Sequence, residues 1–592
     1  MDYLTPDNNY WVVDIEANGL HDATKIWVVV VRNVLESSRV HTFIDSVSFC
    51  SWLHDNDVTL VGHNLLSFDV PTLNRLWGTN ISHSRCVDTL VLSYLYNPVM
   101  SGGHSLKAWG ERLKCPKSDF DDWSRLSEEM IEYCVQDTLV TVNLYVALTT
   151  RMKKYGWSEL SASIEHNFRV IIDEQQRNGF YFDREGALRL YESLRSSEDS
   201  LGTTIRNKFA PRLVSRGTHT YRTRADGTPY ASFTAHEEKY QLRWLDNETY
   251  EKFEQEEFNI ASPKQRIERL LELGWEPTSF TKTGQPQVNE EALVAFAESS
   301  KTPEVQMIAD WLVINGRANM INTWLENLDD DSCIRGRVNS CGAGTRRCTH
   351  SSPNTANIPG IYARFGKESR GLWCARPNRV MVGIDASGLE GRVFIHYLGS
   401  KEAEEFMLND PHTANSLAIS RAIGFPVTRS HTKNLFYARL YGASDSKLGR
   451  MVGAADRGKL IREAIDGNIP GFAELVQQVE REWKTNDTRI QTIDGGYVWC
   501  PSPHAALNYK FQSCGAIVMK VAAQVFKDSA GHLDYLKVGD IHDEWQLDTN
   551  PDHADEVGRI GCEAMTTAGE ILKMNIRLDG EYKIGRNWAE TH

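Results

Sequence analysis

The chain has 592 residues, too many for a single hydrophobic core, and its 41% hydrophobic and 24% charged residues are those of a globular protein with three or four domains. No run of about 18 apolar residues could span a bilayer, residues 1–6 do not begin a secretory signal, and the eleven scattered cysteines form no Cys-x-x-Cys pair, which argues against a zinc ribbon and favours reduced thiols. The net charge of −14 argues against a uniformly basic surface for nucleic acid.

Residues 1–150 show the alternation of strands and helices that is typical of an α/β domain. Apolar runs predict strands at 11–14, 26–31 and 59–62. Helical patterns follow at 90–96 and 128–148.

Three separated segments of this region carry acidic side chains. Asp14 and Glu16 lie two residues apart in a strand, so both carboxylates point to one face and repel each other unless a hard cation lies between them. Asp69 ends a strand-like run that starts at His63, and Tyr133 and Asp137 share one helical face. Asp-x-Glu alone is also typical of a surface turn, but four acids and a phenol from three segments predict a metal site.

The ordered set Asp-x-Glu, Asn-x4-Asp and Tyr-x3-Asp resembles the DEDDy proofreading exonucleases, which have a ribonuclease-H-like fold. The resemblance implies that the substrate is a single-stranded DNA 3′ end and that Tyr133 orients the attacking water. It also implies two Mg²⁺ ions, for which Mn²⁺ substitutes, held by Asp14, Glu16, Asp69 and Asp137. No acid of the pattern is missing, so we expect an active nuclease. Asp88 is expected to cap a helix, with support of the metal-binding acids as the alternative.

From about 155 to 330 the pattern becomes largely helical and charged. Strand-like segments at 221–224 and 230–233 flank Asp226-Gly227, a favoured hairpin-turn pair, and predict a small β-insert on a helical arm. Residues 335–379 then contain nine Lys or Arg and the single acid Glu368. This tract could hold a phosphate backbone in one groove of an acidic protein, or it could be a solvated face that balances acids elsewhere.

The last third of the chain carries a second pair of acidic segments. Asp385 ends a predicted strand at 380–385, helices extend to about 485, and strand-like segments return at 495–501 and 535–547. His542-Asp543-Glu544 interrupts the last strand pattern, and charges in a buried strand are costly unless a metal ion compensates them. A hairpin that exposes these acids at its tip is the alternative.

Between these acids, Arg429, Lys433 and Tyr437 fall at i, i+4 and i+8 of a predicted helix. Two cations and an aromatic ring along one stripe suit a triphosphate beside a base pair, because the cations offset phosphate charge and the ring offers a face to the base and sugar.

Asp385-Ala-Ser-Gly-Leu-Glu390, Arg429-x3-Lys433-x3-Tyr437-x3-Tyr441-Gly442 and His542-Asp543-Glu544 resemble, in that order, motifs A, B and C of the DNA polymerase I family (family A). Residues 345–354, Asn357-Ile358-Pro359 and Asn508-x3-Gln512 agree with it. The local sequences at 383–390, 502–508 and Asn587-Trp588-Ala589 are most similar to those of replicative polymerases of short-tailed, T-seven-like bacteriophages.

This resemblance implies a role for each motif residue. Asp385, Asp543 and the Ala386 carbonyl would bind two metal ions that align the primer 3′-hydroxyl with the α-phosphate of a dNTP. Arg429, Lys433 and His412 would hold the triphosphate, with Lys433 also protonating the pyrophosphate. Glu390 would crowd a ribose 2′-hydroxyl, and Tyr437, with Tyr441 in the same motif, would face the nucleotide. The predicted contacts to primer-template DNA are Arg347, Asn508 and Gln512, with His542 and Glu544 supporting the primer end.

The sequence departs from the phage pattern at two places. Where phage relatives carry a long Lys-rich insert that recruits a host thioredoxin as processivity factor, this chain has only Phe209–Glu257, basic in its first half and acidic in its second. A thioredoxin-like partner is therefore left open. Arg346 stands where the family usually has glycine, and a changed DNA contact is expected there.

We therefore expect an α/β and α+β multidomain protein that replicates a phage genome in the cytoplasm of the bacterial host, with no membrane partner. A ribonuclease-H-like 3′-5′ exonuclease domain is followed by a right-hand polymerase. Two alternatives are an exonuclease with a decayed second half and a non-enzymatic DNA-binding scaffold, but intact acids in both halves argue against them. The expected domains are the exonuclease at 1–150, a linker and helical thumb at 151–334 with a β-insert near 209–257, the palm at 335–410, the fingers at 411–490 and the second part of the palm at 491–592.

Overall fold

The computed structural model describes residues 1–19, 22–277, 279–281, 283–288 and 290–592. These residues form two compact units. The first comprises Met1–Phe182, Asp329–Ile358 and Trp373–His592, and the second comprises Asp183–Leu328 and Pro359–Leu372. Within the described ranges no helix is both long and apolar enough to cross a membrane.

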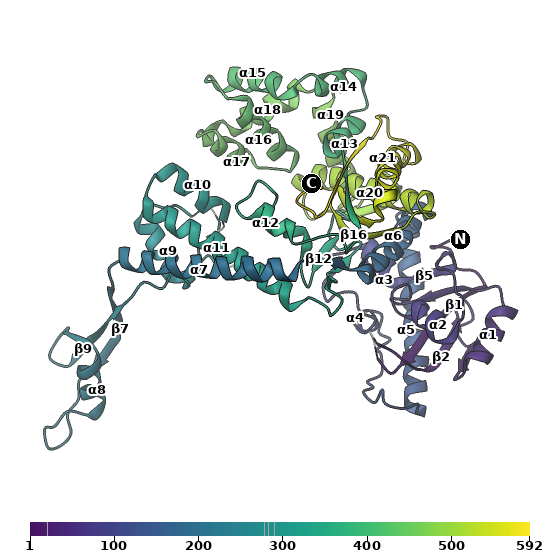
Figure 1. The fold of residues 1–592 in the computed structure, drawn as a ribbon, viewed down its shortest axis with the longest axis horizontal. Helices are drawn as coiled ribbons and strands as arrows, with labels where there is room; N and C mark the ends of the chain where they lie inside the picture. The colour runs from purple at the N-terminus through teal and green to yellow at the C-terminus, as the bar shows by residue number, and fades with distance from the viewer. Residues whose placement is uncertain (20–21, 278, 282, 289) are drawn as a thin grey trace. The chain divides into compact units, whose positions relative to one another are not determined.

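The amino-terminal part of the first unit is a five-stranded mixed sheet with helices on its faces (Figure 1). Its strands are β1 (Tyr10–Ala17), β2 (Ile26–Asn33), β3 (Val40–Phe43), β4 (Thr59–Gly62) and β5 (Cys86–Asp88), in the order β3-β2-β1-β4-β5. Its helices are α1 (Ser46–Asp55), α2 (Asp69–Trp77), α3 (Thr89–Tyr96), α4 (Leu106–Arg112), α5 (Glu128–Lys154) and α6 (Glu159–Asn178). The strands and helices predicted for residues 1–150 are thus confirmed. The apolar run of β2 is buried because helices cover both of its faces.

Local sequence signals set the ends of α5, the long helix that packs on β1 and β2. Ser127 caps its first turn by accepting a hydrogen bond from the Met130 N–H, and acids follow at Glu128 and Glu129. Basic side chains at Arg151 and Lys153 lie in its last turn, where they complement the helix dipole. This helix carries Tyr133 and Asp137 to the face of the sheet.

The carboxy-terminal part of the same unit is built on a four-stranded antiparallel sheet in the order β16-β17-β13-β18. The elements are β13 (Val380–Ala386), β16 (Tyr535–Ile541), β17 (Glu544–Thr549), β18 (Gly580–Gly585), α20 (Ala506–Ser529) and α21 (Ala554–Ile571). The helix α21 packs closely on β13 and β18. This packing requires glycine at two positions, because a Cβ at Gly558 would lie 2.3 Å from the Tyr582 ring and a Cβ at Gly561 would lie 2.3 Å from Ile384.

The pattern at 535–547 proves to be two strands, β16 and β17, and not one interrupted strand. His542 has a φ of 60° and forms, with Asp543, the turn between them. The acidic Asp543 therefore lies at the tip of a hairpin, next to the end of β13.

A helical segment with its own hydrophobic core lies between β13 and the small hairpin of β14 (Arg489–Gln491) and β15 (Tyr497–Trp499). Its helices are α13 (Leu389–Leu398), α14 (Lys401–Leu408), α15 (Pro411–Ile423), α16 (Arg429–Leu440), α17 (Asp445–Met451), α18 (Gly458–Asn468) and α19 (Phe472–Thr485). Two further strand pairs complete the unit: β6 (Phe180–Tyr181) with β10 (Cys333–Ile334), and β11 (Arg337–Asn339) with β12 (Thr349–Ser351).

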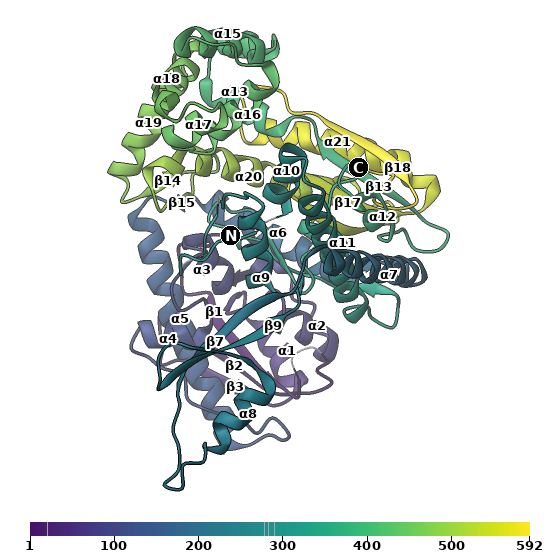
Figure 2. The same ribbon diagram turned by 90° about the vertical axis from the view of Figure 1, so that its left-hand side faces the viewer.

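The second unit is largely helical and carries a three-stranded sheet, β7-β9-β8, at one end (Figures 1 and 2). Its helices are α7 (Arg184–Lys208), α8 (Ala231–Lys239), α9 (Pro263–Glu272), α10 (Glu290–Ser300), α11 (Pro303–Glu326) and α12 (Gly366–Gly371). Its strands are β7 (Arg212–Thr220), β8 (Gln241–Trp244) and β9 (Thr249–Glu256).

The hairpin predicted around Asp226-Gly227 is wrong in both arms, since β7 ends at Thr220 and neither 221–224 nor 230–233 forms a strand. A turn with Gly227 at φ 82° is present, but strand pairing there is limited to one bridge between Thr223 and Pro229. Residues 231–233 begin α8 instead of a strand, because Ala231 and the run 237–239 (Glu-Glu-Lys) are strong helix formers.

Candidate active sites

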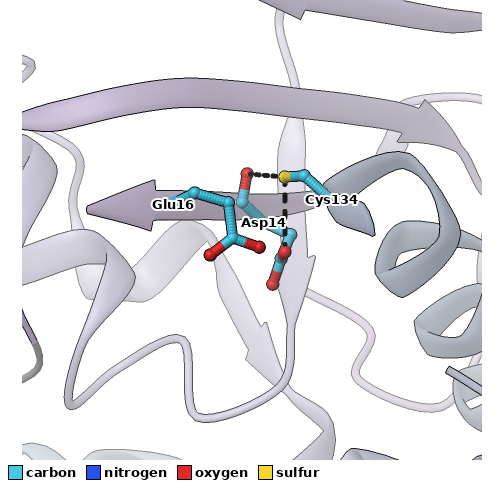
Figure 3. Close-up of side chains that lie close together, drawn as sticks. All are labelled: Asp14, Glu16 and Cys134. Carbon is cyan, nitrogen blue, oxygen red and sulfur yellow. Dashed lines mark hydrogen bonds between the residues drawn. The ribbon is translucent and has the colours of Figure 1, made fainter. Parts of the chain in front are cut away.

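The first group of acids gathers at the face of β1. Asp14 and Glu16 project from the same side of the strand (Figure 3). Asp69 is the first residue of α2, after a turn and not at a strand end as predicted, and Tyr133 and Asp137 lie one turn apart on α5. All five line one cavity of about 430 Å³, so the structure brings together the set predicted from three segments.

These four carboxylates strongly perturb one another. Burial, and then the charge of Asp137, raises the pKa of Asp14, and burial together with Asp14 raises the pKa of Glu16 and of Asp69. Burial also raises the pKa of Asp137, against the opposing charge of Lys117. Further positive charge in the site would therefore favour the ionised form of all four groups.

The donor set fits a hard divalent cation. Carboxylate oxygens are the ligands that Mg²⁺ prefers in proteins. In the part of the chain that the structure describes, Oδ1 of the buried Asp137 has no hydrogen-bond partner, which leaves one carboxylate oxygen without a partner in a residue that lines the cavity. Asp14, Glu16, Asp69 and Asp137 are thus the residues that would hold the metal.

Asp88 holds the chain that leads into Asp69. Its buried carboxylate accepts hydrogen bonds from the N–H groups of Asn64 (3.0 Å), Leu66 (3.1 Å) and Leu90 (2.8 Å). The bond to Leu90 caps α3, which confirms the predicted cap, and the other two fix the turn before α2. The N–H of Asp88 in turn donates to Nε2 of His166 on α6, at 2.9 Å. The helix cap is thus confirmed, and the same carboxylate orders the turn that leads to Asp69.

Two residues of this site were not predicted. Lys117, in the segment between α4 and α5, forms an ion pair with Asp137, and its Nζ lies 4.7 Å from the centre of the Tyr133 ring. Cys134 Sγ lies 3.4 Å from Asp14 Oδ2, and ligand atoms of Asp14, Glu16 and Cys134 lie within 4.8 Å of one another (Figure 3). Cys134 shares a helical face with Asp137, which the i, i+3 spacing could have indicated. No sequence spacing pointed to Lys117.

The second pair of acids meets at one end of the carboxy-terminal sheet. Register places Asp385 opposite Glu544, and the Ala386 N–H donates to the carbonyl of Asp543 at 3.0 Å. Burial, and then the charge of Asp543, raises the pKa of Asp385 to about 7, and burial raises the pKa of Asp543. Two half-buried carboxylates in this state suit a shared divalent ion.

A cavity of about 30 Å³ lies beside Asp543. The predicted residues that line it are Arg347, Glu390, Tyr441, Gln512, His542 and Asp543. The Tyr441 hydroxyl donates to both carboxylate oxygens of Glu390, at 2.8 and 2.7 Å, and Arg347 Nη2 lies 3.6 Å from Glu390 Oε1. Glu390 thus links the end of α16 to the start of α13.

The helix α16 presents the predicted stripe of two cations and a ring. Arg429 and Lys433 are exposed, and the half-buried Tyr437 ring is inclined by 25° to that of Tyr441, with the ring centres 6.4 Å apart. Arg429 pairs with Asp410 at 3.0 Å, and the His412 ring lies 6.2 Å from that of Tyr437. Among the described residues His412 Nδ1 has no hydrogen-bond partner.

The remaining predicted residues divide into two groups. Asn508 and Gln512 lie one turn apart on α20, and within the described ranges Asn508 Oδ1 has no hydrogen-bond partner. Glu544 is buried in β17, where it accepts hydrogen bonds from the Trp588 indole and from His592 Nδ1. The Glu544 side chain therefore holds the carboxy-terminal segment against β17.

Arg346 turns into the protein interior and not toward a DNA surface. Its guanidinium pairs with Glu165 and with Asp494, each at 2.7 Å, and Lys520 pairs with Glu165 at 2.7 Å. All four side chains are 2% exposed or less. The expected change in a DNA contact at Arg346 is thus corrected: this arginine completes a buried group of two cations and two anions that joins α6, α20 and the β14–β15 hairpin.

Arg346→Gly is expected to destabilise the first unit by about 3–5 kcal/mol, because Glu165 and Asp494 would lose their shared partner while buried. Glycine accepts the φ of 62° at this position, so the effect reports the charge and not backbone strain. Thermal unfolding of the full chain measures it. Arg347→Gly, at a side chain 28% exposed, is the control and should leave the unfolding temperature nearly unchanged. An unshifted transition for Arg346→Gly would contradict a stabilising role.

Comparison with known proteins places these sites in a family. Residues 230–590 match DNA polymerase family A, and residues 42–153 match a 3′-5′ exonuclease family. The DNA-directed DNA polymerase of Escherichia phage T7 is 29% identical over 98% of this chain and 100% of its own length. That of Enterobacteria phage T3 is 29% identical over 90% of this chain and 92% of its own length.

The fold comparison agrees. A solved structure described as the POL domain of Pol1 from M. smegmatis in complex with DNA primer-template and dNTP has a TM-score of 0.73, at 18% identity, over 98% of this chain and 95% of that one. The matched family covers more than half of the sequence and contains the cluster of Asp385 and Asp543, while the exonuclease match contains Asp69 and Asp137. The chain therefore belongs to DNA polymerase family A and carries a 3′-5′ exonuclease domain ahead of its polymerase part.

Proposed function

We propose that this protein copies a phage genome by template-directed DNA synthesis and proofreads it, with two Mg²⁺ ions acting at each of two carboxylate sites. The observation that carries the proposal is that Asp385 and Asp543 are adjacent at one end of the carboxy-terminal sheet. A separate set of four acids lines the cavity at β1. Primer extension on a primed template, with Mg²⁺ and with or without dNTPs, tests both activities. A wild-type protein that neither extends nor shortens the primer would refute the proposal.

In the polymerase site, Asp385, Asp543 and the Ala386 carbonyl are the proposed metal ligands. When bound, Mg²⁺ would supply charge stabilisation for phosphoryl transfer and would lower the pKa of the primer 3′-hydroxyl. The exposed Arg429 and Lys433 would bind the triphosphate, with His412 beside them. Glu390, fixed by Tyr441, would occupy the space of a ribose 2′-hydroxyl.

We propose that residues 1–150 form the exonuclease, 151–334 the linker and thumb, 335–410 and 491–592 the palm, and 411–490 the fingers. The division would place every proposed metal ligand of the polymerase in the palm and every triphosphate contact in the fingers.

A basic cavity supports single-stranded DNA as the exonuclease substrate. A space of about 1280 Å³ is lined by α2, α3, α6, β11 and β12, and it shares His63 and Phe68 with the exonuclease cavity. Its arginines are Arg75, Arg169, Arg177, Arg335 and Arg337. Arg177 and Arg337 are exposed and form no ion pair with any described residue, so they are free to bind phosphates. We infer that a frayed primer 3′ end reaches Asp14 and Glu16 along this cavity.

Dideoxynucleotides are expected to be incorporated nearly as well as dNTPs, because the Tyr437 hydroxyl at the nucleotide face would replace the hydrogen bond of a missing 3′-hydroxyl. Tyr437→Phe should reduce dideoxynucleotide incorporation about 10- to 100-fold, the value of a hydrogen bond to a charged group. Single-nucleotide extension with ddNTP and dNTP measures the ratio. Tyr441→Phe is the control, since that hydroxyl serves Glu390. If wild type rejects ddNTPs as strongly as ribonucleotides, the role given to Tyr437 fails.

Removal of metal ions is expected to lower the unfolding temperature of the exonuclease domain more at high pH than at low pH. The pKa of Asp14 is raised from 3.8 to about 7, so the stability gained from its proton is complete below about pH 4 and is lost as the pH rises through 7. Mg²⁺ compensates the charge, so its gain in unfolding temperature over EDTA should be larger at pH 8 than at pH 5. Differential scanning fluorimetry measures both gains. Equal gains at the two pH values would contradict metal binding at these acids.

A further inference from the structure

The exonuclease cavity holds a cation of its own. Among the described residues that line it, Lys117 is the single Lys or Arg, and burial lowers the pKa of the lining His63 to about 3. The Lys117 side chain is 19% exposed and pairs with Asp137, which is 4% exposed. Burial alone would lower the pKa of Lys117, but the Asp137 carboxylate outweighs it and raises that pKa, so the ammonium stays charged.

The backbone just before Lys117 is held in place. The Gln136 amide, on the turn of α5 between Tyr133 and Asp137, donates to the carbonyl of Pro116 at 2.8 Å. The Cys115 N–H donates to Gly110 at 2.9 Å, an approach that requires glycine because a Cβ there would lie 2.7 Å from the Cys115 oxygen. Lys117 is therefore fixed over α5 by its own chain and does not reach the site from a free surface.

Lys117 pairs with only one of the two oxygens of the Asp137 carboxylate. Lys117 engages Oδ2 of Asp137, whereas Oδ1 of Asp137 has no hydrogen-bond partner among the described residues. The ammonium also lies 4.7 Å from the centre of the Tyr133 ring, the phenol proposed to orient the attacking water. The cation thus lies between a proposed metal ligand and the proposed water-orienting group.

Charge balance gives this cation a task. Four carboxylates and two divalent ions sum to zero, so they leave the single negative charge of a phosphodiester uncompensated. Hydrolysis adds the water oxygen to phosphorus and breaks the bond to O3′, which takes up the other water proton, and negative charge on the phosphoryl oxygens grows on the way. One fixed ammonium restores the balance.

We propose that Lys117 is a further catalytic residue of the exonuclease, which compensates the charge of the scissile phosphate. The inference rests on the proposed exonuclease site of Asp14, Glu16, Asp69 and Asp137. Because the charge it compensates grows during the reaction, Lys117 acts on the chemical step more than on substrate binding. Because it repels cations, it does not strengthen metal binding.

The test compares full-length Lys117→Met and Lys117→Arg with wild type on a single-stranded oligonucleotide. Lys117→Met should lower the exonuclease kcat about 100-fold with KM changed less than about threefold, and Lys117→Arg, which keeps the charge, should recover most of the loss. Mn²⁺ binding, followed by electron paramagnetic resonance, should be at least as tight in Lys117→Met as in wild type. Lys107→Met, at a lysine 69% exposed on α4, is the matched control and should change nothing.

Each outcome is decisive. Primer extension by Lys117→Met at the wild-type rate verifies that the chain is folded. Full exonuclease activity in Lys117→Met would overturn the proposal, as would a loss that accompanies weaker Mn²⁺ binding and disappears at high Mg²⁺, because Lys117 would then only shape the metal site. A wild-type protein without exonuclease activity would instead refute the function on which the inference rests.

Discussion

Asp385→Ala is expected to abolish primer extension, with a loss of at least about 1000-fold, while degradation of single-stranded DNA continues. Asp385 and Asp543 meet at one end of the sheet, where we propose that each binds the metal ions that contact the phosphates. Loss of one ligand removes several kcal/mol of charge stabilisation from phosphoryl transfer, and each 1.4 kcal/mol is a factor of ten in rate. Extension of a labelled primer with dNTPs and Mg²⁺ measures the effect.

The matched control for this variant is Glu581→Ala. Glu581 on β18 lies opposite Asp385 on β13 in the antiparallel register, and its charge contributes to the raised pKa of Asp385. Its side chain is exposed and lies outside the cavity beside Asp543. Its replacement should leave extension within a few-fold of wild type. Extension that survives in Asp385→Ala would show that the two acids do not form the polymerase site.

Asp14→Ala is expected to abolish the 3′-5′ exonuclease by a similar factor and to leave the rate of DNA synthesis unchanged. Asp14 lines the cavity with Glu16 and Asp137, and its removal leaves a proposed metal ion without one of its charged ligands. Degradation of a labelled single strand without dNTPs measures the loss, and primer extension by the same protein measures synthesis.

Asp57→Ala, at an aspartate 86% exposed in the same domain, is the matched control and should keep both activities. Asp14→Ala and Asp385→Ala together test whether the two sites act independently. If Asp14→Ala and Asp385→Ala each lost both activities, the reading of two separate sites would be wrong.

The two sites are nevertheless joined by one helix of the first unit. His166 on α6 accepts a hydrogen bond from the N–H of Asp88, which orders the turn before Asp69. The neighbouring Glu165 pairs with Arg346, next to Arg347 of the cavity beside Asp543. This helix therefore fixes elements of both sites from a common core.

Much of the catalytic chemistry was readable from local sequence. The spacing of Asp14 and Glu16 on a strand, and of Tyr133 and Asp137 on a helix, required only the periods of those elements. The apolar runs at 26–31 and 380–385 likewise predicted the strands β2 and β13, because a run of buried apolar residues is a local pattern. Prediction failed at 231–233, where helix propensity competed with a turn signal. At 535–547 the sequence left a hairpin with acids at its tip as the alternative, and the structure has that hairpin.

The sequence by itself indicated the carboxylates of the two sites and the family that the chain resembles, because local structure sets the spacing of those carboxylates within each strand and helix. Only the tertiary structure decided that Lys117 meets Asp137, that Arg346 is buried against Glu165, and that Glu544 turns to His592. The reason is physical. These contacts join distant segments through burial and charge pairing, and no periodicity within a helix or strand records them.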